Sequence, residues 1–263
     1  MANMHMAFLL PAVFLIAVFM TMAGRGGGNF YVLLQVLAGA SMHLAASTGQ
    51  LIMCFTSLAA LIVFQKHKNV AWRMALFLGL TASLTAFFGG LLAHFFAGTV
   101  LKLVFACLLV LASFLMLYPV SESTSSVPKS GHWSFESGEV TIHVNLWLAA
   151  PFAIATGFFA GMVGVSGGSF LIPLMVLACR MPMKLAVGTA SVMVGATAGM
   201  GFLGHVVESG IEWSWAVPQV AVALIGGLLG GKLALKTKPK VLKSIFALTT
   251  LAAAIFMYVN ALV

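Results

Sequence analysis

The chain has 263 residues, of which 62% are hydrophobic and only 7% are charged. A soluble domain carries about 25% charged residues, so this composition excludes a water-soluble globular protein and is typical of a protein with many membrane spans. The formal net charge is +8, but the basic residues are spread over short connectors between apolar stretches. Basic residues keep such connectors in the cytoplasm, which explains the positive charge. Nucleic-acid binding is therefore not expected.

Eight apolar stretches are each long enough for the ~20 residues of a helix that crosses a bilayer. They cover residues 6–23, 41–64, 71–95, 100–118, 144–163, 185–207, 214–235 and 241–262. Two shorter apolar pieces, residues 31–40 and 171–179, are too short for a full crossing. They are predicted to be half-helices that each follow a glycine break. The predicted fold class is therefore an all-α integral membrane protein.

A glycine-rich string occurs twice, as GRGGGNF at residues 24–30 and as GVSGGSF at residues 164–170. The similarity continues downstream, where Thr48 recurs as Thr189. A duplicated unit with a broken hydrophobic segment at matching positions is typical of a secondary transporter built from two repeats.

The chain is predicted to divide into a first transmembrane repeat (residues 1–118), a linker (119–143) and a second transmembrane repeat (144–263). Each repeat has four long helices and one short re-entrant helix, an odd number, so the second repeat is expected to be inverted relative to the first. The loop at 65–69 is basic and its counterpart at 206–212 is acidic, which places them on opposite sides of the membrane, the first in the cytoplasm. The Ser-rich linker is predicted to be a cytoplasmic connection rather than a small folded loop domain.

The two glycine breaks are the candidate substrate site. Irregular backbone survives at membrane depth only where it lines a cavity or is buried in protein, and the helix that starts after each break offers free N–H groups and a partial positive charge to an anion. Inverted repeats would bring two such helix starts face to face near the midplane, although glycines can also serve only to pack helices closely. The candidate substrate-binding residues are Gly24, Arg25, Gly27, Gly28, Asn29, Ser47, Thr48, Gln50, Gly164, Ser166, Gly167, Gly168, Ser169, Gly188, Thr189 and Ser191.

The acidic residues favour an anion as the substrate. The chain contains no Asp, and its five Glu lie in the linker or in the loop at 206–212. Cation and proton pumps commonly place a carboxylate within the membrane, and no carboxylate is available here. Arg25 stands inside the first glycine string, where it either pairs with an anionic substrate or is an interfacial arginine that sets the topology.

The second glycine string belongs to the longer run GFFAGMVGVSGGSFLIPLMVL (residues 157–177), which AVGTASVMV (186–194) follows. This order of a glycine-rich loop, a hydrophobic segment with Pro173 and a small-residue stretch resembles the sulfite exporter TauE/SafE family of membrane permeases, over nearly the whole chain except the linker. The resemblance implies a multi-pass protein of the cell (inner) membrane that transports a small sulfur-containing or organic anion, such as sulfite or sulfoacetate, by alternating access. In the first repeat Arg25 occupies a usually small or apolar position and Leu33 replaces the proline, which leaves the substrate open.

Two other functions compete with anion transport. The GVSG run at 164–167 is similar to the nucleophile motif of intramembrane serine proteases, with His205 as a conceivable base, but the first copy has Gly26 where Ser166 stands. A permease for soft metal ions would use Met and His residues, such as those at 4–6. The preferred interpretation is a transporter and not an enzyme, with no cofactor or metal, whose partners are a small anion and the lipid bilayer. Whether it forms a homodimer is left open.

Overall fold

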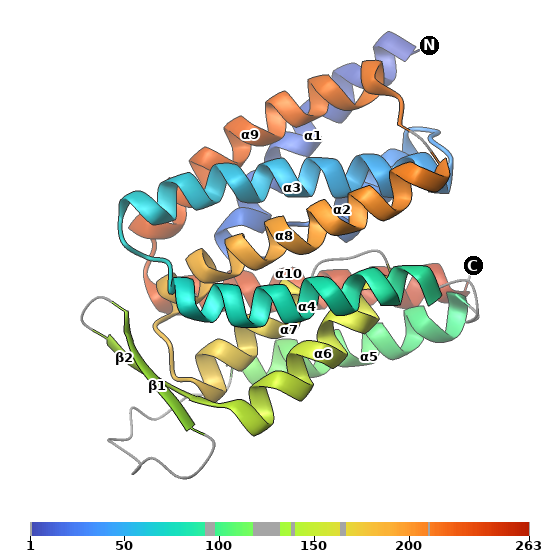
Figure 1. The fold of residues 1–263 in the computed structure, drawn as a ribbon. Coiled ribbons are helices and arrows are strands. Elements are labelled where there is room, and N and C mark those ends of the chain that lie inside the picture. The colour runs from blue at the N-terminus through green and yellow to red at the C-terminus, as the bar shows by residue number, and fades with distance from the viewer. Residues whose placement is uncertain are drawn as a thin grey trace.

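The computed structural model describes residues 2–92, 98–117, 132–137, 140–163, 167–209 and 211–262. The described part is almost entirely helical (Figure 1). The first half contains α1 (Ala2–Ala23), α2 (Gly28–Leu37), α3 (Met42–Lys66), α4 (Trp72–Leu92) and α5 (Gly98–Leu117). The second half contains α6 (Leu146–Val163), α7 (Gly168–Pro173) with a π-helical turn η2 (Leu174–Ala178), α8 (Met183–Ser209), α9 (Trp213–Lys236) and α10 (Pro239–Leu262).

The helices expected from the sequence are confirmed, with ends that differ by a few residues. Among the described residues, five helices are long and apolar enough to cross a membrane by their length and composition. The protein is therefore a helical membrane protein. The shortness of α2 and of α7 with η2 also agrees with the prediction of half-helices after glycine breaks.

A β-hairpin precedes α6, in a region where the sequence predicted only a linker. Strand β1 (His132–Ser137) pairs antiparallel with β2 (Val140–Asn145). Apolar and polar residues alternate along β2, so that Ile142 and Val144 are buried in the main core while His143 between them is exposed. This alternation has the period of a strand with one buried face, and it extends the ordered structure beyond the helices.

Four pairs of equivalent helices begin 140 or 141 positions apart, whereas α1 and α6 begin 144 positions apart. In Figure 1 the members of each long pair, such as α3 with α8 and α4 with α9, run in opposite directions along the bundle. The pairs of first residues are Gly28 and Gly168, Met42 and Met183, Trp72 and Trp213, and Gly98 and Pro239.

The packing of the helices also repeats with the halves exchanged. Helices α3 and α8 contact each other, and each contacts a helix of the opposite half, α3 with α9 and α8 with α4. Helix α9 packs in turn on α1, and α4 packs on α6. Helices α5 and α10 pack against each other. Every main contact between helices is therefore either made twice or joins a helix to its own equivalent.

Glycines bring the backbones of these helices close together. A Cβ built on Gly226 of α9 would lie 2.6 Å from Ala17 Cβ of α1, and one built on Gly227 would lie 2.6 Å from the Thr56 carbonyl oxygen of α3. Helix α9 uses two adjacent glycines because it packs on two helices. At the equivalent contact of α6 with α4 the glycine is on α6, where Gly157 lies against Ala82. Small residues have this role in membrane bundles, where packing replaces the hydrophobic effect.

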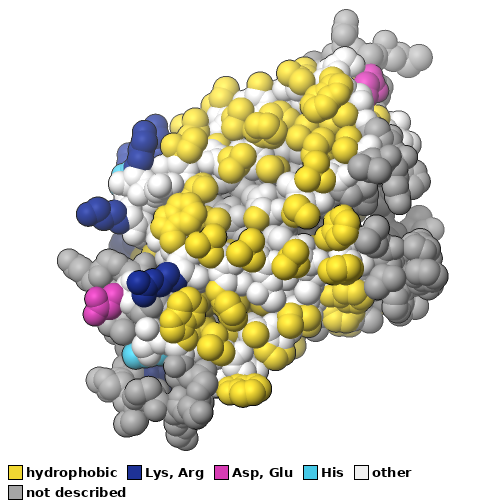
Figure 2. Space-filling view, in the orientation of Figure 1, with side chains coloured by type: hydrophobic (Ala, Val, Ile, Leu, Met, Phe, Trp, Pro, Cys, Tyr) yellow, Lys and Arg dark blue, Asp and Glu magenta, His cyan; other side chains and the backbone are white. Residues whose placement is uncertain are grey.

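The two ends of the bundle differ in charge. Figure 2 shows an apolar surface over the middle of one face, with the visible Lys and Arg side chains gathered mainly at one end. Helix α3 ends there with Lys66 and α9 ends there with Lys236, both exposed. The two chain termini lie at the opposite end in Figure 1. By the positive-inside rule the basic end is expected to face the cytoplasm.

This orientation can be tested by labelling single cysteines with a membrane-impermeant maleimide in a variant without native cysteines. Lys68→Cys and Ser214→Cys both replace exposed residues, one in the α3–α4 loop and one at the start of α9. We expect Ser214→Cys to be labelled in intact cells and Lys68→Cys only after permeabilisation. The reverse pattern would place the basic end outside.

Candidate functional site

The first glycine string forms a tight turn between α1 and α2. Gly24 has a left-handed φ of +71°, and its N–H donates to the Thr21 carbonyl (3.0 Å) while that of Arg25 donates to the Met20 carbonyl (3.1 Å). This pair of bonds is a Schellman motif, which satisfies carbonyls at a helix end. Gly26 and Gly27 also have positive φ, +71° and +77°. Glycine adopts this conformation without the strain that a side chain adds, so the backbone itself requires the string.

The turn leaves backbone donors at the start of α2 without a carbonyl acceptor among the described residues. The N–H groups of Gly28 and Asn29, in the first turn of α2, donate to no carbonyl of the described chain. Helix α7 likewise begins directly after a glycine, at Gly168. Free N–H groups at a helix start carry a partial positive charge and favour an anion.

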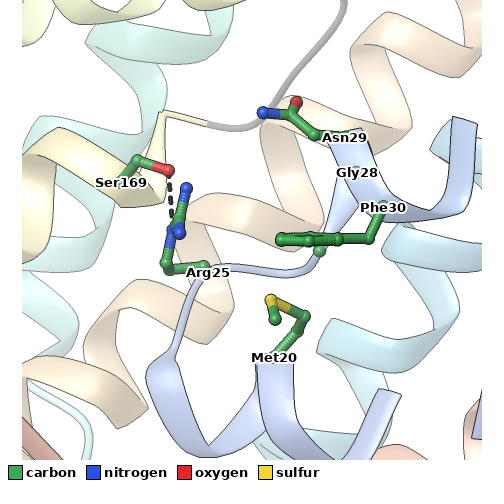
Figure 3. A pocket seen from close by; sticks show the side chains of 7 residues that line it. Met20, Arg25, Gly28, Asn29, Phe30 and Ser169 are labelled. Carbon is green, nitrogen blue, oxygen red and sulfur yellow. Dashed lines mark hydrogen bonds between the residues drawn. The ribbon is translucent and has the colours of Figure 1, made fainter. Parts of the chain in front are cut away.

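Arg25 connects the starts of the two half-helices. Its side chain is only 4% exposed, so it lies inside the helix bundle and not on its surface. Its Nε donates to Ser169 Oγ at the start of α7, 3.0 Å away (Figure 3). Its Cζ lies 5.8 Å from the centre of the Phe246 ring on α10. A guanidinium from the first half therefore lies beside the half-helix of the second.

A small pocket surrounds this guanidinium, with room for about one water-sized molecule. Asn29 Oδ1 is buried there and has no hydrogen-bond partner among the described residues. The pocket is lined by Met20, Arg25, Gly27, Gly28, Asn29, Phe30 and Ser169 (Figure 3). A second small pocket involves the same glycine turn and is lined by Thr21, Gly24, Gly26, Ser57, Ala60, Ser191 and Val194.

The two pockets collect part of the predicted site. Together they are lined by Ser169, Ser191 and all of the first glycine string (residues 24–30). Gly168 lies against Gly24 and Arg25. Gly167 caps the start of α7. Residues Ser47, Thr48 and Gln50 are buried in α3 but line neither of these pockets, and Gly164 and Ser166 lie outside the described residues.

The structure places Gly188 and Thr189 elsewhere, near the first turn of α8 and under the α3–α4 loop. Thr189 Oγ1 accepts a hydrogen bond from the Ala71 N–H (3.0 Å) and donates to the Leu185 carbonyl (2.7 Å). A Cβ on Gly188 would overlap the Asn69 carbonyl. Both residues thus hold α8 to the start of α4, and neither is brought to the two pockets described above.

Sequence reasoning missed several residues of this region. Met20 and Phe30 line the first pocket and Phe246 contacts Arg25, yet nothing distinguishes them from the many other apolar residues of the spans. A buried amide pair was also missed. Gln35 Nε2 of α2 donates to Gln219 Oε1 of α9, 2.6 Å away, and both side chains are fully buried. The sequence could have indicated this contact, because each glutamine is a polar residue within a predicted apolar stretch.

Such a helical membrane bundle, with two half-helices whose starts meet inside it, is an architecture of membrane transporters. The chain belongs to the sulfite exporter TauE/SafE family, whose sequence profile matches residues 9–257. It is 27% identical over 237 residues to a "Probable membrane transporter protein" of Xylella fastidiosa (strain Temecula1), covering 88% of this chain and 87% of the relative. It is 23% identical over 234 residues to "Probable membrane transporter protein YunE" of Bacillus subtilis (strain 168), covering 84% and 85%.

No solved structure matches the chain significantly. Family membership makes the protein a multi-pass membrane transporter and not an enzyme, so the protease interpretation of Ser166 falls.

The contact between the two glycine turns can be tested with neighbouring alanine substitutions. A Cβ on Gly168 would lie 2.7 Å from Val194 Cγ2 and 3.0 Å from the Gly24 carbonyl oxygen, whereas on Gly167 the nearest atom is 3.4 Å away. Overpacking costs about 1–3 kcal/mol. We therefore expect Gly168→Ala to lower the Tm of the detergent-solubilised protein and Gly167→Ala to leave it nearly unchanged. Equal Tm values for the two variants would contradict the close contact.

The role of Thr189 can be tested against its equivalent in the other half. Thr48 Oγ1 is buried and has no hydrogen-bond partner among the described residues. Thr189→Val leaves the buried Ala71 N–H without its acceptor, which costs about 1–3 kcal/mol, so the Tm should fall. Thr48→Val removes a hydroxyl that makes no hydrogen bond, and the Tm should stay the same or rise. A larger fall in Tm for Thr48→Val than for Thr189→Val would contradict the assignment of the stabilising hydrogen bond to Thr189.

Proposed function

We propose that the protein is a secondary transporter, a permease or exporter for a small sulfur-containing or organic anion such as sulfite or sulfoacetate. The anion binds near the membrane midplane between the two glycine-rich turns, and the site opens to each side in alternation. The family description supports a sulfur oxyanion, while the printed names of the relatives say only that they are probable membrane transporters.

The observation that carries the proposal is the buried guanidinium at the starts of both half-helices. Arg25 reaches Ser169 of α7 and lines one pocket with Gly28 and Asn29 of α2. Arginine and free backbone N–H groups are the donors that bind oxyanions in proteins. Hydroxyl groups such as that of Ser169 add a neutral hydrogen bond. An anion placed here would meet donors from both halves of the chain.

The charges of the chain support an anion over a cation. No Asp occurs anywhere in the sequence. Glu136 lies in β1 and Glu212 precedes α9, both exposed. Among the described residues no group of three His, Cys, Asp or Glu side chains could hold a metal ion. The described lining of the pocket contains no carboxylate, so a cation there would face the charge of Arg25.

We further propose that the halves are inverted repeats. The equal spacing of helix starts, the opposite directions of equivalent helices and the exchanged contacts all support this arrangement. Inverted repeats supply two equivalent but opposite ways to close a central site. At the basic end Thr189 and Gly188 seal α8 against the α3–α4 loop. Thr48, at the equivalent position of α3, makes no such bond, which supports a conformation closed at the cytoplasmic end.

The substrate class can be tested by replacing Arg25 in purified protein. Sulfite or sulfoacetate should raise the Tm of the wild type, and an uncharged sulfone of similar size should not. Because charge-assisted hydrogen bonds contribute about 1.5–3 kcal/mol, Arg25→Gln should weaken anion binding at least about tenfold.

Arg73→Gln is the matched control, since Arg73 is exposed at the start of α4. It should bind the anion as the wild type does. A protein stabilised by metal cations alone, or an Arg25→Gln variant with wild-type affinity, would refute the anion site.

A further inference from the structure

The amide oxygen of Asn29 is an unfilled hydrogen-bond acceptor in the pocket around Arg25. Oδ1 is buried and has no partner among the described residues, and the residue as a whole is only 8% exposed. Buried carbonyl oxygens almost always have a hydrogen-bond partner. Figure 3 shows the Asn29 amide across the pocket from Ser169. A ligand in the pocket is therefore placed to supply the missing donor.

The equivalent residue of the second half has its oxygen filled. Asn29 and Ser169 are each the second residue of their half-helix, 140 positions apart, and both line this pocket. Ser169 Oγ accepts a hydrogen bond from Arg25 Nε (3.0 Å), whereas Asn29 Oδ1 accepts none from the described residues. The apolar side chains of the lining, Met20 and Phe30, carry no N–H or O–H group. The two halves thus differ in one acceptor that is left for the ligand.

The same pocket also contains donors for an anion. The backbone N–H groups of Gly28 and Asn29 donate to no carbonyl of the described chain, and the Arg25 side chain lines the pocket beside them. Such groups bind the negative oxygens of an oxyanion. A fully ionised oxyanion has only acceptors, so it would leave Asn29 Oδ1 unpaired. An oxyanion that keeps one proton on oxygen matches both kinds of group, and a site that binds a ligand O–H group discriminates strongly against analogues without it.

We propose that the pocket selects a singly charged oxyanion with a proton on one of its oxygens, and that Asn29 Oδ1 accepts a hydrogen bond from this O–H group. The inference rests on the proposed anion site and narrows its substrate class. Hydrogensulfite carries such a proton, whereas fully ionised sulfite, sulfate and sulfoacetate do not. Asn29 is then the residue that determines specificity, while Arg25 and the N–H groups at the start of α2 hold the negative oxygens.

The test uses two probes of the same shape and charge. At one weakly acidic pH, methanesulfonate and the monoanion of methylphosphonate each carry a single negative charge, and they differ by one proton on oxygen. Their binding to the purified protein is measured by isothermal titration calorimetry. We expect methylphosphonate to bind at least about tenfold more tightly, because methanesulfonate leaves a buried acceptor unpaired. At the same pH, hydrogensulfite should bind more tightly than sulfate.

Two variants separate the acceptor from the rest of the pocket. Asn29→Leu has a similar shape without the amide oxygen, so the ratio of the two affinities should fall toward one. Ser169→Ala is the matched control at the equivalent position of the same pocket. It leaves Asn29 Oδ1 in place, so both anions should bind more weakly while their ratio stays high. Without ligand, the Tm of Asn29→Leu should equal or exceed that of the wild type, because an unpaired buried oxygen is removed.

The outcomes distinguish this inference from the proposed function. Equal affinities of the wild type for methanesulfonate and methylphosphonate, or an unchanged ratio in Asn29→Leu, would overturn selection by the proton and leave the anion site standing. A lower Tm of unliganded Asn29→Leu would show that Oδ1 already has a partner in the protein, and would overturn the inference in the same way. Absence of binding of sulfite, hydrogensulfite, sulfoacetate and both probes would overturn the proposed function and this inference with it.

Discussion

Backbone groups inside an apolar bundle need hydrogen-bond partners, and this constraint governs the centre of the molecule. Lipid offers no partners, so a break in a helix must be buried in protein or face a cavity. In the turn after α1, the N–H groups of Gly24 and Arg25 donate hydrogen bonds to carbonyls of the last turn of α1. The donors at Gly28 and Asn29 remain. These donors, with Arg25 beside them, are the groups on which the proposed anion site depends.

The sequence predicts the scaffold well because its signals are strong and local. Long apolar stretches mark the spans, and the two glycine strings mark the places where α2 and α7 begin, although each half-helix starts three residues earlier than predicted, at Gly28 and Gly168. The role of a single polar side chain is harder to predict. The Thr189 hydroxyl could satisfy either a solute or a helix start, and only its place beside Ala71 decides between them. The ring of Phe246 reaches Arg25 through packing that no sequence pattern records.

The glycines illustrate the same limit. Gly27 is required by its positive φ, whereas Gly226 is required by the closeness of α1. Gly167 has neither requirement, because its φ is −66° and a Cβ there would make ordinary contacts. All three stand in glycine-rich runs and look alike in the sequence. The duplicated glycine strings therefore identify where the chain bends and packs. Only the structure distinguishes a glycine required by its backbone conformation from one required by a closely packed helix.

The two halves share their backbone plan but not their chemistry. Position 165, the equivalent of Arg25, is Val, so one half alone supplies the cation of the site. The hydrogen bond from Ala71 to Thr189 likewise has no counterpart at Thr48. A scaffold of two equivalent halves can close at either end with similar packing, but only one end here is fixed by a threonine that caps the next helix. If the proposed alternation between two conformations holds, these differences between the halves would set which conformation is the more stable.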